Sequence, residues 1–470
     1  MGHIPVVREG RDAVRSAALL MVTMLAENFP GVQTLHAIGN HDTHPYYSSS
    51  ATTWQDWEQD WRNSPVLGAS YVERQLPGAA LAEWRTGGYY MVRLHTTGGK
   101  PGGRLWGISL NTNALALGVG ASQLRWLEQR LTALRANGEH AVLLGHIPPG
   151  PSHYELDSIC ARGHYYHRAG GACYEPRAQA ALVHLLTSFS DVVPASYFGH
   201  HHTPSVRVLG EVSEGSEGSE GSEGIQGNGG GGGSGGGGGD GGGGGGGGRG
   251  GWSSSIPPAS HIMYLSPSLT PRNPTHDPTV RLYTYNRSTG EPLDLCDFSF
   301  NISIANEAQV KSNQVKSNQV KSSQVKSSQV KSSRVDEATV AAATSAEDVV
   351  AEAATAEGAM AEDDAERLTW RQQRAVGVGP LNLTSLAPTS WQRALSRMLE
   401  ADHDPKGTRE LQPSDPFLAW NSADRCALET YVDSGRAEVG PLRRCKLAQL
   451  CAALYLADRP YARCIGMLDW

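Results

Sequence analysis

The sequence contains no apolar run of the roughly 18 residues that a membrane-spanning helix needs. It also lacks an excess of basic residues, since 40 lysines and arginines against 47 aspartates and glutamates give a formal net charge of −7. Such a chain has no positive field for a nucleic-acid polymer or an anionic membrane surface. The N-terminus, Met1-Gly2-His3-Ile4-Pro5, lacks the basic and then apolar pattern of a secretory signal. These absences give no support to a membrane-spanning or nucleic-acid-binding role.

Cysteine is also scarce, with seven in 470 residues. This number is too small for a disulfide scaffold, yet four of the seven lie in the last 45 residues, unlike the scattered buried thiols of cytosolic proteins. Three glycosylation sequons begin at Asn286, Asn301 and Asn382. Sequons arise by chance in chains of this length, but together with the clustered cysteines they favour an oxidising compartment.

Many of the 56 glycines lie in one stretch, where a Glu-Gly-Ser repeat is followed by almost pure glycine. Such a segment has too little apolar surface to offset its chain entropy, so we expect it to be disordered. A second biased segment, 309–334, repeats every five residues, which matches neither a helix nor a strand. We therefore predict a domain over 1–304 with a disordered insertion at about 211–255, a low-complexity linker over 305–379 and a helical domain over 380–470.

Apolar residues between 11 and 285 alternate between helical and strand spacing. Helices are predicted over 11–29, 124–134, 178–189, 391–399 and 426–464. Strands are predicted over 34–38, 104–110, 141–144, 195–198, 206–209, 262–265 and 279–285. Alternating strands and helices with polar residues at the strand ends are typical of a layered α/β fold. The two strands that flank the insertion are expected to pair as neighbours.

The region from Tyr46 to Trp61 is rich in tyrosine and tryptophan. We predict a long loop with helical turns here. Its aromatic side chains are expected to pack beneath the loop rather than to form a platform for a ligand. Residues 151–175, which include two cysteines, are predicted to form an irregular excursion.

Three consecutive histidines follow the predicted strand 195–198, in Gly199-His200-His201-His202. Alternate residues of an extended segment point the same way, so His200 and His202 are predicted to present two ring nitrogens to one place. Imidazole nitrogens are common ligands of zinc. A histidine-rich surface loop without a ligand is the alternative for this stretch alone.

Two further stretches follow predicted strands in the same way, Gly39-Asn40-His41-Asp42 and Gly145-His146-Ile147-Pro148-Pro149-Gly150. A metal pair that activates water needs imidazoles, carboxylates and amide oxygens delivered from several strand ends. His41 adjoins a ligand candidate, and its imidazole could protonate a leaving oxygen. The three strand ends supply four candidate metal ligands: Asn40, His146, His200 and His202.

This ordered set resembles the calcineurin-like metallophosphoesterases, specifically acid sphingomyelinase and the acid sphingomyelinase-like phosphodiesterases. The family usually has Gly-His-Thr-His where this chain has its histidine triplet. The likeness covers roughly 2–210, 261–304 and 380–466. It also rests on Ser109-Leu110-Asn111-Thr112-Asn113, on the stretch from Leu383 to Trp391, and on Cys445 to Cys451 with Cys464 thirteen positions on.

The resemblance implies a layered metallophosphoesterase β-sandwich flanked by helices, with a small α-helical, disulfide-bearing C-terminal lobe. It implies two zinc ions, one held by Asn40, His146 and His200 and the other held in part by His202. His41 becomes the acid that protonates the leaving group. His201 stands at the position of a non-ligand threonine and is expected to be a bystander.

The chain also departs from the family. Gly2-His3-Ile4-Pro5 stands where the family has Gly-Asp-Ile-Pro, so His3 replaces the aspartate that bridges the zincs, and no Asp-x-His motif precedes the first helix. An imidazole can bind one metal ion but does not bridge two as a carboxylate does. We therefore expect a chain that is N-terminally truncated relative to the family and holds half of the metal site. A non-catalytic module that keeps the fold is the alternative.

The resemblance also suggests a disulfide between Cys451 and Cys464 in the C-terminal lobe. Cys160 and Cys173 could close the irregular excursion. Cys445 could pair with Cys426, which would leave Cys296 odd. A free thiol is the alternative for any of these cysteines.

As an enzyme of this family, the chain is expected to hydrolyse sphingomyelin to ceramide and phosphocholine with zinc as cofactor. Nucleotide phosphoesters, the substrates of the sphingomyelinase-like branch, are the close alternative. The implied partner is a phosphodiester substrate of lipid type, which is compatible with peripheral contact with a membrane, and no nucleic-acid polymer. The implied location is the extracellular space or the lumen of a lysosome or vacuole, and no feature of the sequence predicts an oligomeric state.

Overall fold

The fold is described from a computed structural model of the whole chain. It describes residues 10–45, 47–94, 104–150, 174–202, 204–210, 258–270, 277–300, 302, 306, 371–372, 383–402 and 450–454. Several predictions lie outside these ranges: the disordered insertion, the linker, the irregular excursion, His3, most of the predicted helix 426–464, and five of the seven cysteines.

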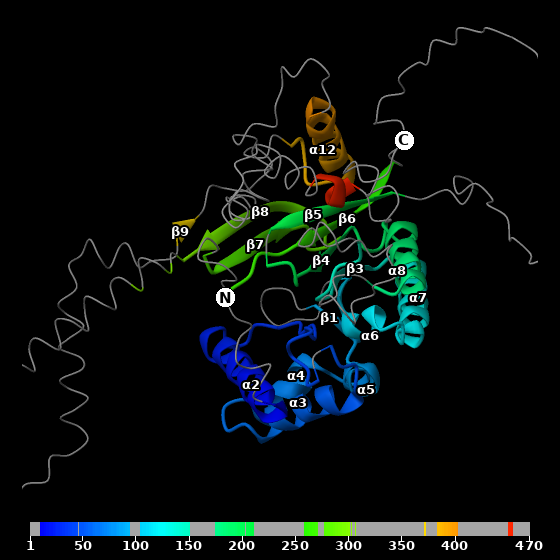
Figure 1. Cartoon of the computed structure of the whole chain (residues 1–470). Coiled ribbons are helices and arrows are strands. Elements are labelled where there is room, and N and C mark those ends of the chain that lie inside the picture. Colours follow the sequence, from blue (N-terminus) through cyan, green and yellow to red (C-terminus); the bar gives the residue numbers. More distant parts are fainter. Residues whose placement is uncertain are drawn as a thin grey trace, which may run out of the picture.

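A six-stranded mixed sheet forms the centre of the molecule, with the strand order β1-β2-β3-β4-β6-β5 (Figure 1). Four of its strands run parallel, and the two edge strands β1 and β5 run antiparallel to their neighbours. The strands are β1 (Tyr90–Arg93), β2 (Leu105–Ser109), β3 (His140–Leu144), β4 (Ala195–Phe198), β5 (Ser205–Gly210) and β6 (Ala259–Leu265). The predicted α/β class is confirmed, because parallel strands joined through helices make up most of this sheet.

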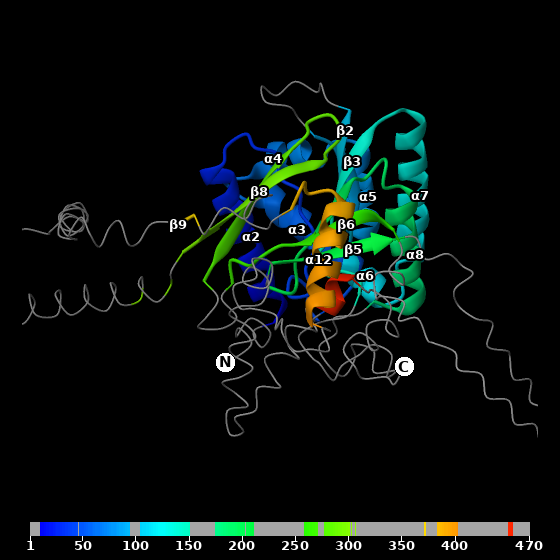
Figure 2. The same ribbon diagram turned by 90° about the horizontal axis from the view of Figure 1, so that it is seen from above.

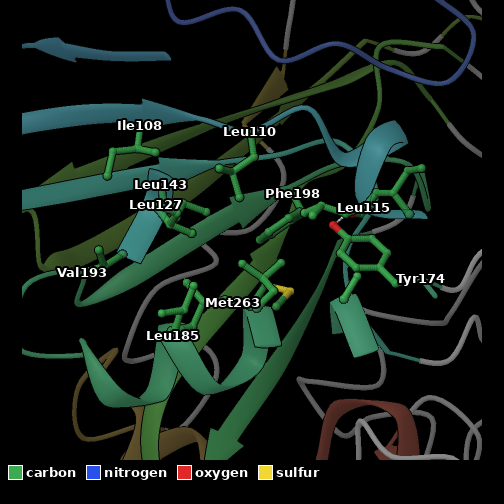
Figure 3. Packing of buried hydrophobic residues seen from close by; sticks show 14 of the residues in the cluster. Ile108, Leu110, Leu115, Leu127, Leu143, Tyr174, Leu185, Val193, Phe198 and Met263 are labelled. Carbon is green, nitrogen blue, oxygen red and sulfur yellow. Dashed lines mark hydrogen bonds between the residues drawn. The ribbon is translucent and has the colours of Figure 1, made fainter. Parts of the chain in front are cut away.

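Helices α7 (Ala121–Ala136) and α8 (Pro176–Ser188) lie side by side along the sheet in both views (Figures 1 and 2). Their leucines follow the predicted helical spacing, and the buried members face the strands. Figure 3 shows Leu127 of α7 and Leu185 of α8 packed with Leu143 of β3 and Phe198 of β4. The short helix α6 (Thr112–Ala116) adds Leu115 to this cluster. Helices α7 and α8 were expected from their periodicity, and both are confirmed.

A group of four helices packs against the β1 side of the sheet, with α2 (Arg11–Asn28), α3 (Ala51–Asn63), α4 (Gly68–Gln75) and α5 (Ala79–Gly87). The predicted loop over 46–61 is wrong, because most of that stretch forms α3. Trp54, Trp57 and Trp61 recur at helical spacing and are all buried. The expectation that these aromatics are packing residues is confirmed.

The predicted strand 34–38 is wrong, although this segment runs beside β2. Its backbone groups bond to side chains instead of to a strand: the Thr34 amide donates to Gln75 Oε1 at 2.8 Å, and the His36 amide donates to the Tyr90 hydroxyl at 2.7 Å. A Cβ built on Gly107 of β2 would lie only 2.6 Å from Leu35 Cδ1, so the segment packs closely over that strand. Side-chain oxygens thus accept the backbone hydrogen bonds that a neighbouring strand would otherwise accept.

A second sheet, β7-β8-β9, contains β7 (Thr279–Tyr285), β8 (Pro292–Ser299) and β9 (Arg371–Gln372). It is tied to the first sheet by Arg281, which is 1% exposed, donates to both carboxylate oxygens of Asp297 at 2.6 and 2.7 Å, and reaches the Leu265 carbonyl at 3.2 Å. A buried pair of this kind tolerates the loss of either partner poorly.

Helix α12 (Pro388–Asp402) and the helical residues 450–454 pack onto β5 and β6. Trp391 donates its indole N–H to the Tyr264 hydroxyl of β6 at 3.2 Å, and Leu450 joins the same buried cluster. Cys451 is disulfide-bonded, and Cys464, its predicted partner, lies outside the described residues. The described part of the predicted C-terminal domain therefore shares its hydrophobic core with the sheet.

Strands β5 and β6 pair antiparallel over their whole length, from Ser205 opposite Leu265 to Gly210 opposite Ala259. The prediction that the strands flanking the glycine-rich insertion are neighbours is thus confirmed. The helices described here include none with the length and apolar character to cross a membrane.

His261 of β6 predicts a specific pH dependence of stability. The ring is fully buried, with Nδ1 3.0 Å from the Val193 carbonyl and Nε2 2.9 Å from Ser196 Oγ. Burial lowers the pKa of His261 to about 3, against the opposing effect of the bond to Val193. The unfolded chain protonates His261 near pH 6.5, whereas the folded chain does so only near pH 3. The neutral ring therefore costs the fold no stability above pH 6.5, and the free energy of unfolding decreases as the pH falls from 6.5 toward 3.

We expect the free energy of unfolding in urea to fall by about 2–3 kcal/mol between pH 6.5 and 4.5 through this residue. His261→Asn keeps a donor for Val193 but cannot titrate, so its stability should depend less on pH over the same interval. His184→Asn on the exposed face of α8 is the control. An equal slope in the unmodified chain and in His261→Asn contradicts this assignment.

Candidate functional site

Strands β3 and β4 are each followed by the dipeptide Gly-His at the same edge of the sheet. Their parallel pairing continues past the last strand residues, because the Gly145 amide donates to the Tyr197 carbonyl at 2.9 Å and the Gly199 amide donates to the His146 carbonyl at 3.0 Å. His146 and His200 are thereby brought together, with ring centroids 5.2 Å apart and the rings edge to face. Parallel pairing is the reason that two distant motifs meet.

Asn40 reaches the same point from the segment beside β2. Its side chain is 1% exposed, and its Oδ1 lies 2.7 Å from His146 Nε2 and 3.2 Å from His200 Nδ1. Three of the four predicted ligands, from three separate parts of the chain, thus converge on one oxygen atom.

The pKa of His146 lies well below its ordinary value. Burial is the largest cause, followed by the positive charges that His200, His202 and His41 would carry. His41, His200 and His202 therefore all lie within electrostatic reach of His146. The shift keeps the His146 ring neutral at physiological pH, and a neutral imidazole is the form that binds a metal.

The prediction that His200 and His202 share an extended segment is wrong. Both have left-handed backbone, with φ of 68° and 58°, and β4 already ends at Phe198. The chain therefore turns through the triplet, and the ring of His201, placed between them, is 1% exposed. This turn, rather than strand alternation, brings His200 to Asn40. His202 lies close enough to His146 for its charge to contribute to the lowered pKa of His146.

His41 and Asp42 follow Asn40 in the same loop. His41 is exposed, which leaves its imidazole accessible from solvent. Asp42 accepts the Gly39 amide at 2.8 Å, and burial raises the pKa of its carboxyl although this bond opposes the shift. A Cβ on Gly39 would lie 2.8 Å from Asp42 Oδ2 and 3.2 Å from His146 Cε1, so only glycine fits between them.

The sequence prediction did not include Tyr47 in the site. Its amide donates to the Asn40 carbonyl at 3.1 Å, and its buried ring meets the ring of His200 edge-on with centroids 6.3 Å apart. Tyr47 thus contacts both the amide ligand candidate and one histidine.

The donors that meet are two imidazole nitrogens and one amide oxygen. Over the described ranges, no group of three or more histidine, cysteine, aspartate or glutamate side chains is arranged to hold a metal ion. The part of the chain that is described therefore brings together the donors predicted for one ion and no carboxylate that bridges two. The ligand roles of Asn40, His146, His200 and His202, and the acid role of His41, stay predictions.

Comparison with known proteins gives several relatives, while no protein-family model matches the chain. It is 24% identical to the cyclic GMP-AMP phosphodiesterase of Homo sapiens over 329 residues, which cover 65% of this chain and 55% of the relative. It is 22% identical to the human acid sphingomyelinase-like phosphodiesterase 3b over 328 residues, with the same coverage. Sphingomyelinase phosphodiesterase C of Dictyostelium discoideum is 23% identical over 292 residues, covering 60% of this chain and 52% of the relative.

The chain spans about half the length of these relatives. Three of the motifs that carry the resemblance lead to one cluster at the edge of an α/β sheet. Over the region that these comparisons cover, the chain is therefore similar to the acid sphingomyelinase and acid sphingomyelinase-like phosphodiesterases, the family that its motifs resemble.

Proposed function

We propose that the chain is a metal-dependent phosphoric diester hydrolase whose active centre is the cluster of Asn40, His146 and His200. The observation that carries the proposal is the convergence of two ring nitrogens on Asn40 Oδ1, at 2.7 and 3.2 Å, from three separate segments. Relatives named phosphodiesterases support the class of reaction.

Zinc is the proposed cofactor, because imidazole nitrogen and amide oxygen are donors that suit it. Asn40, His146 and His200 would hold one ion and leave a position for water or substrate. Support comes from the burial that keeps His146 neutral. The second zinc implied by the resemblance would take His202 as one of its ligands. A bound zinc supplies Lewis-acid stabilisation of the phosphate charge and a water of lowered pKa.

The residues of the chain then have separate tasks. The buried amide of Asn40 and the two rings orient the phosphodiester at the sheet edge. One water gives up a proton to the surrounding solvent, and its oxygen bonds to phosphorus while the bond from phosphorus to the ester oxygen breaks. His41, exposed beside Asn40, gives its imidazolium proton to the departing alkoxide, so that a phosphomonoester and an alcohol are released.

The names of the relatives support two classes of substrate. The human relatives include a cyclic GMP-AMP phosphodiesterase, and two Dictyostelium relatives are named for sphingomyelin or sphingomyelinase. The human match covers a somewhat larger share of this chain, and we therefore place nucleotide phosphodiesters first and sphingomyelin second. Peripheral membrane contact belongs only to the second candidate.

A location outside the cell or in a lysosomal lumen completes the proposal. The sequon Asn286-Arg287-Ser288 lies in the turn between β7 and β8, where Arg287 and Ser288 are exposed. The disulfide at Cys451 also suits an oxidising compartment. The sequons at Asn301 and Asn382 begin outside the described residues.

The metal site predicts uptake of about one zinc per chain after equilibrium dialysis, measured by elemental analysis. Asn40→Ala and His146→Ala each remove a donor and should lower this content to a small fraction. His184→Ala on α8 is the control and should keep it. Well under one zinc in the unmodified folded chain contradicts the metal-dependent mechanism.

The role of His41 predicts a dependence on the leaving group. His41→Gln should lower kcat about 10²- to 10⁴-fold on esters that release an alkoxide, because the proton donor is lost. With bis(4-nitrophenyl) phosphate the loss should be small, since nitrophenolate leaves without a proton. His184→Gln should match the unmodified enzyme on both. Equal losses on both esters would show that His41 is not the acid.

Substrate class is tested by assaying the zinc-loaded chain with cyclic GMP-AMP and with sphingomyelin in detergent micelles at equal concentration. We expect a higher kcat/KM for the nucleotide, with phosphate-ester products identified by mass spectrometry. Faster release of phosphocholine reverses the order of the two candidates. Asn40→Ala serves as the blank, because any activity it retains belongs to a contaminant.

A further inference from the structure

The segment Ser109–Asn113 contacts two of the three loops that carry the predicted ligands, the Asn40 loop and the His146 loop. It leaves β2 at the same edge of the sheet, and all of its residues are buried. Ser109 Oγ donates to the His36 carbonyl at 2.7 Å, and Asn113 Nδ2 donates to the Gly39 carbonyl at 3.1 Å. Two side chains of one short segment thus hold the backbone that leads into Asn40.

Thr112 holds the other loop. Its Oγ1 accepts the Ile147 amide at 2.9 Å and the His146 amide at 3.3 Å, and it also bonds to the hydroxyl of Tyr174. Tyr174 donates to the Ile147 carbonyl at 2.6 Å. The peptide groups on both sides of Ile147 are therefore fixed, directly after the residue whose ring meets Asn40.

This bridging matters because the Asn40 loop is not part of the sheet. Backbone ladders fix the position of His146 relative to His200, whereas side-chain bonds fix the segment that ends in Asn40. Asn40 and His146 are 106 residues apart in the chain, yet their side chains meet at 2.7 Å. A metal site needs this spacing to be held when the ion is absent as well as when it is present.

We propose that Thr112 and Asn113 are positioning residues that set the separation of the Asn40 and His146 loops and thereby the affinity of the site for its metal ion. The proposal rests on the proposed function, because it concerns the same site. Neither side chain is placed among the ligands. Their effect is on the backbone, through the Gly39 carbonyl on one side and the His146 and Ile147 amides on the other.

Thr112 allows a matched pair of variants. A Cβ on Gly145 would lie 2.8 Å from Thr112 Cγ2, so the methyl group packs on Gly145 while the hydroxyl serves the two amides. Thr112→Val keeps the methyl group and loses the acceptor, and Thr112→Ser does the reverse. We expect Thr112→Val to bind Co²⁺ about 10- to 100-fold more weakly than the unmodified chain, and Thr112→Ser to stay within about threefold.

The measurement is titration of the metal-free full chain with Co²⁺, followed by the visible absorption of the bound ion. Asn113→Leu should weaken binding to a similar degree as Thr112→Val. Asn111→Leu is its control: Asn111 is also a buried amide of this segment but donates to the Gly87 carbonyl at 3.0 Å, away from both loops. Asn111→Leu therefore reports on general destabilisation. Unchanged affinity in Thr112→Val, or an equal loss in Asn111→Leu and Asn113→Leu, overturns the proposal.

Failure of the proposed function is distinguishable from failure of this inference. If the unmodified chain takes up no Co²⁺, the metal-dependent mechanism fails, and hydrogen exchange of the peptide that contains His146 and Ile147 decides the positioning role. Faster exchange of these amides in Thr112→Val but not in Thr112→Ser supports it. Equal exchange in the two variants overturns it.

Discussion

The parallel pairing of β3 with β4 is the constraint on which the candidate site depends. Leu144 lies opposite Tyr197, and the ladder continues through the glycine that follows each strand. Parallel strands end at the same edge, so any residue placed just beyond one strand meets the residue placed just beyond the next. The helices α7 and α8 stabilise this arrangement, since their leucines bury the face of the sheet formed by the same two strands. The chemistry at the edge thus depends on packing within the layer.

Periodicity alone predicted much of this framework. The leucine spacing of α7 and the apolar runs of β3 and β4 reflect burial against one layer, and burial is what repeats in the sequence. The pairing of β5 with β6 was likewise predictable, because two strand-like runs flank a stretch with no capacity to form a core. The motifs that contain them, rather than their surroundings, indicated Asn40, His146 and His200.

What the sequence could not predict was governed by contacts between distant residues. The segment 34–38 has the composition of a strand, but Gln75 and Tyr90 take its backbone bonds, and nothing local to the segment signals this. The helix α3, by contrast, could have been predicted, because Trp54, Trp57 and Trp61 recur at helical spacing with polar residues on the other face. Strand alternation was also the wrong basis for pairing His200 with His202, since both residues turn out of the extended conformation.

The left-handed backbone at His200 and His202 limits which amino acids can occupy this turn. That conformation costs a residue with a Cβ about 1–2 kcal/mol, and glycine, asparagine, aspartate and histidine tolerate it best. Among these four, histidine alone offers a ring nitrogen. A glycine at position 200 would relax the turn and remove the side chain that meets Asn40. Thermal stability and ligand placement therefore favour different residues at the same position, so selecting variants for heat resistance would tend to select against the site.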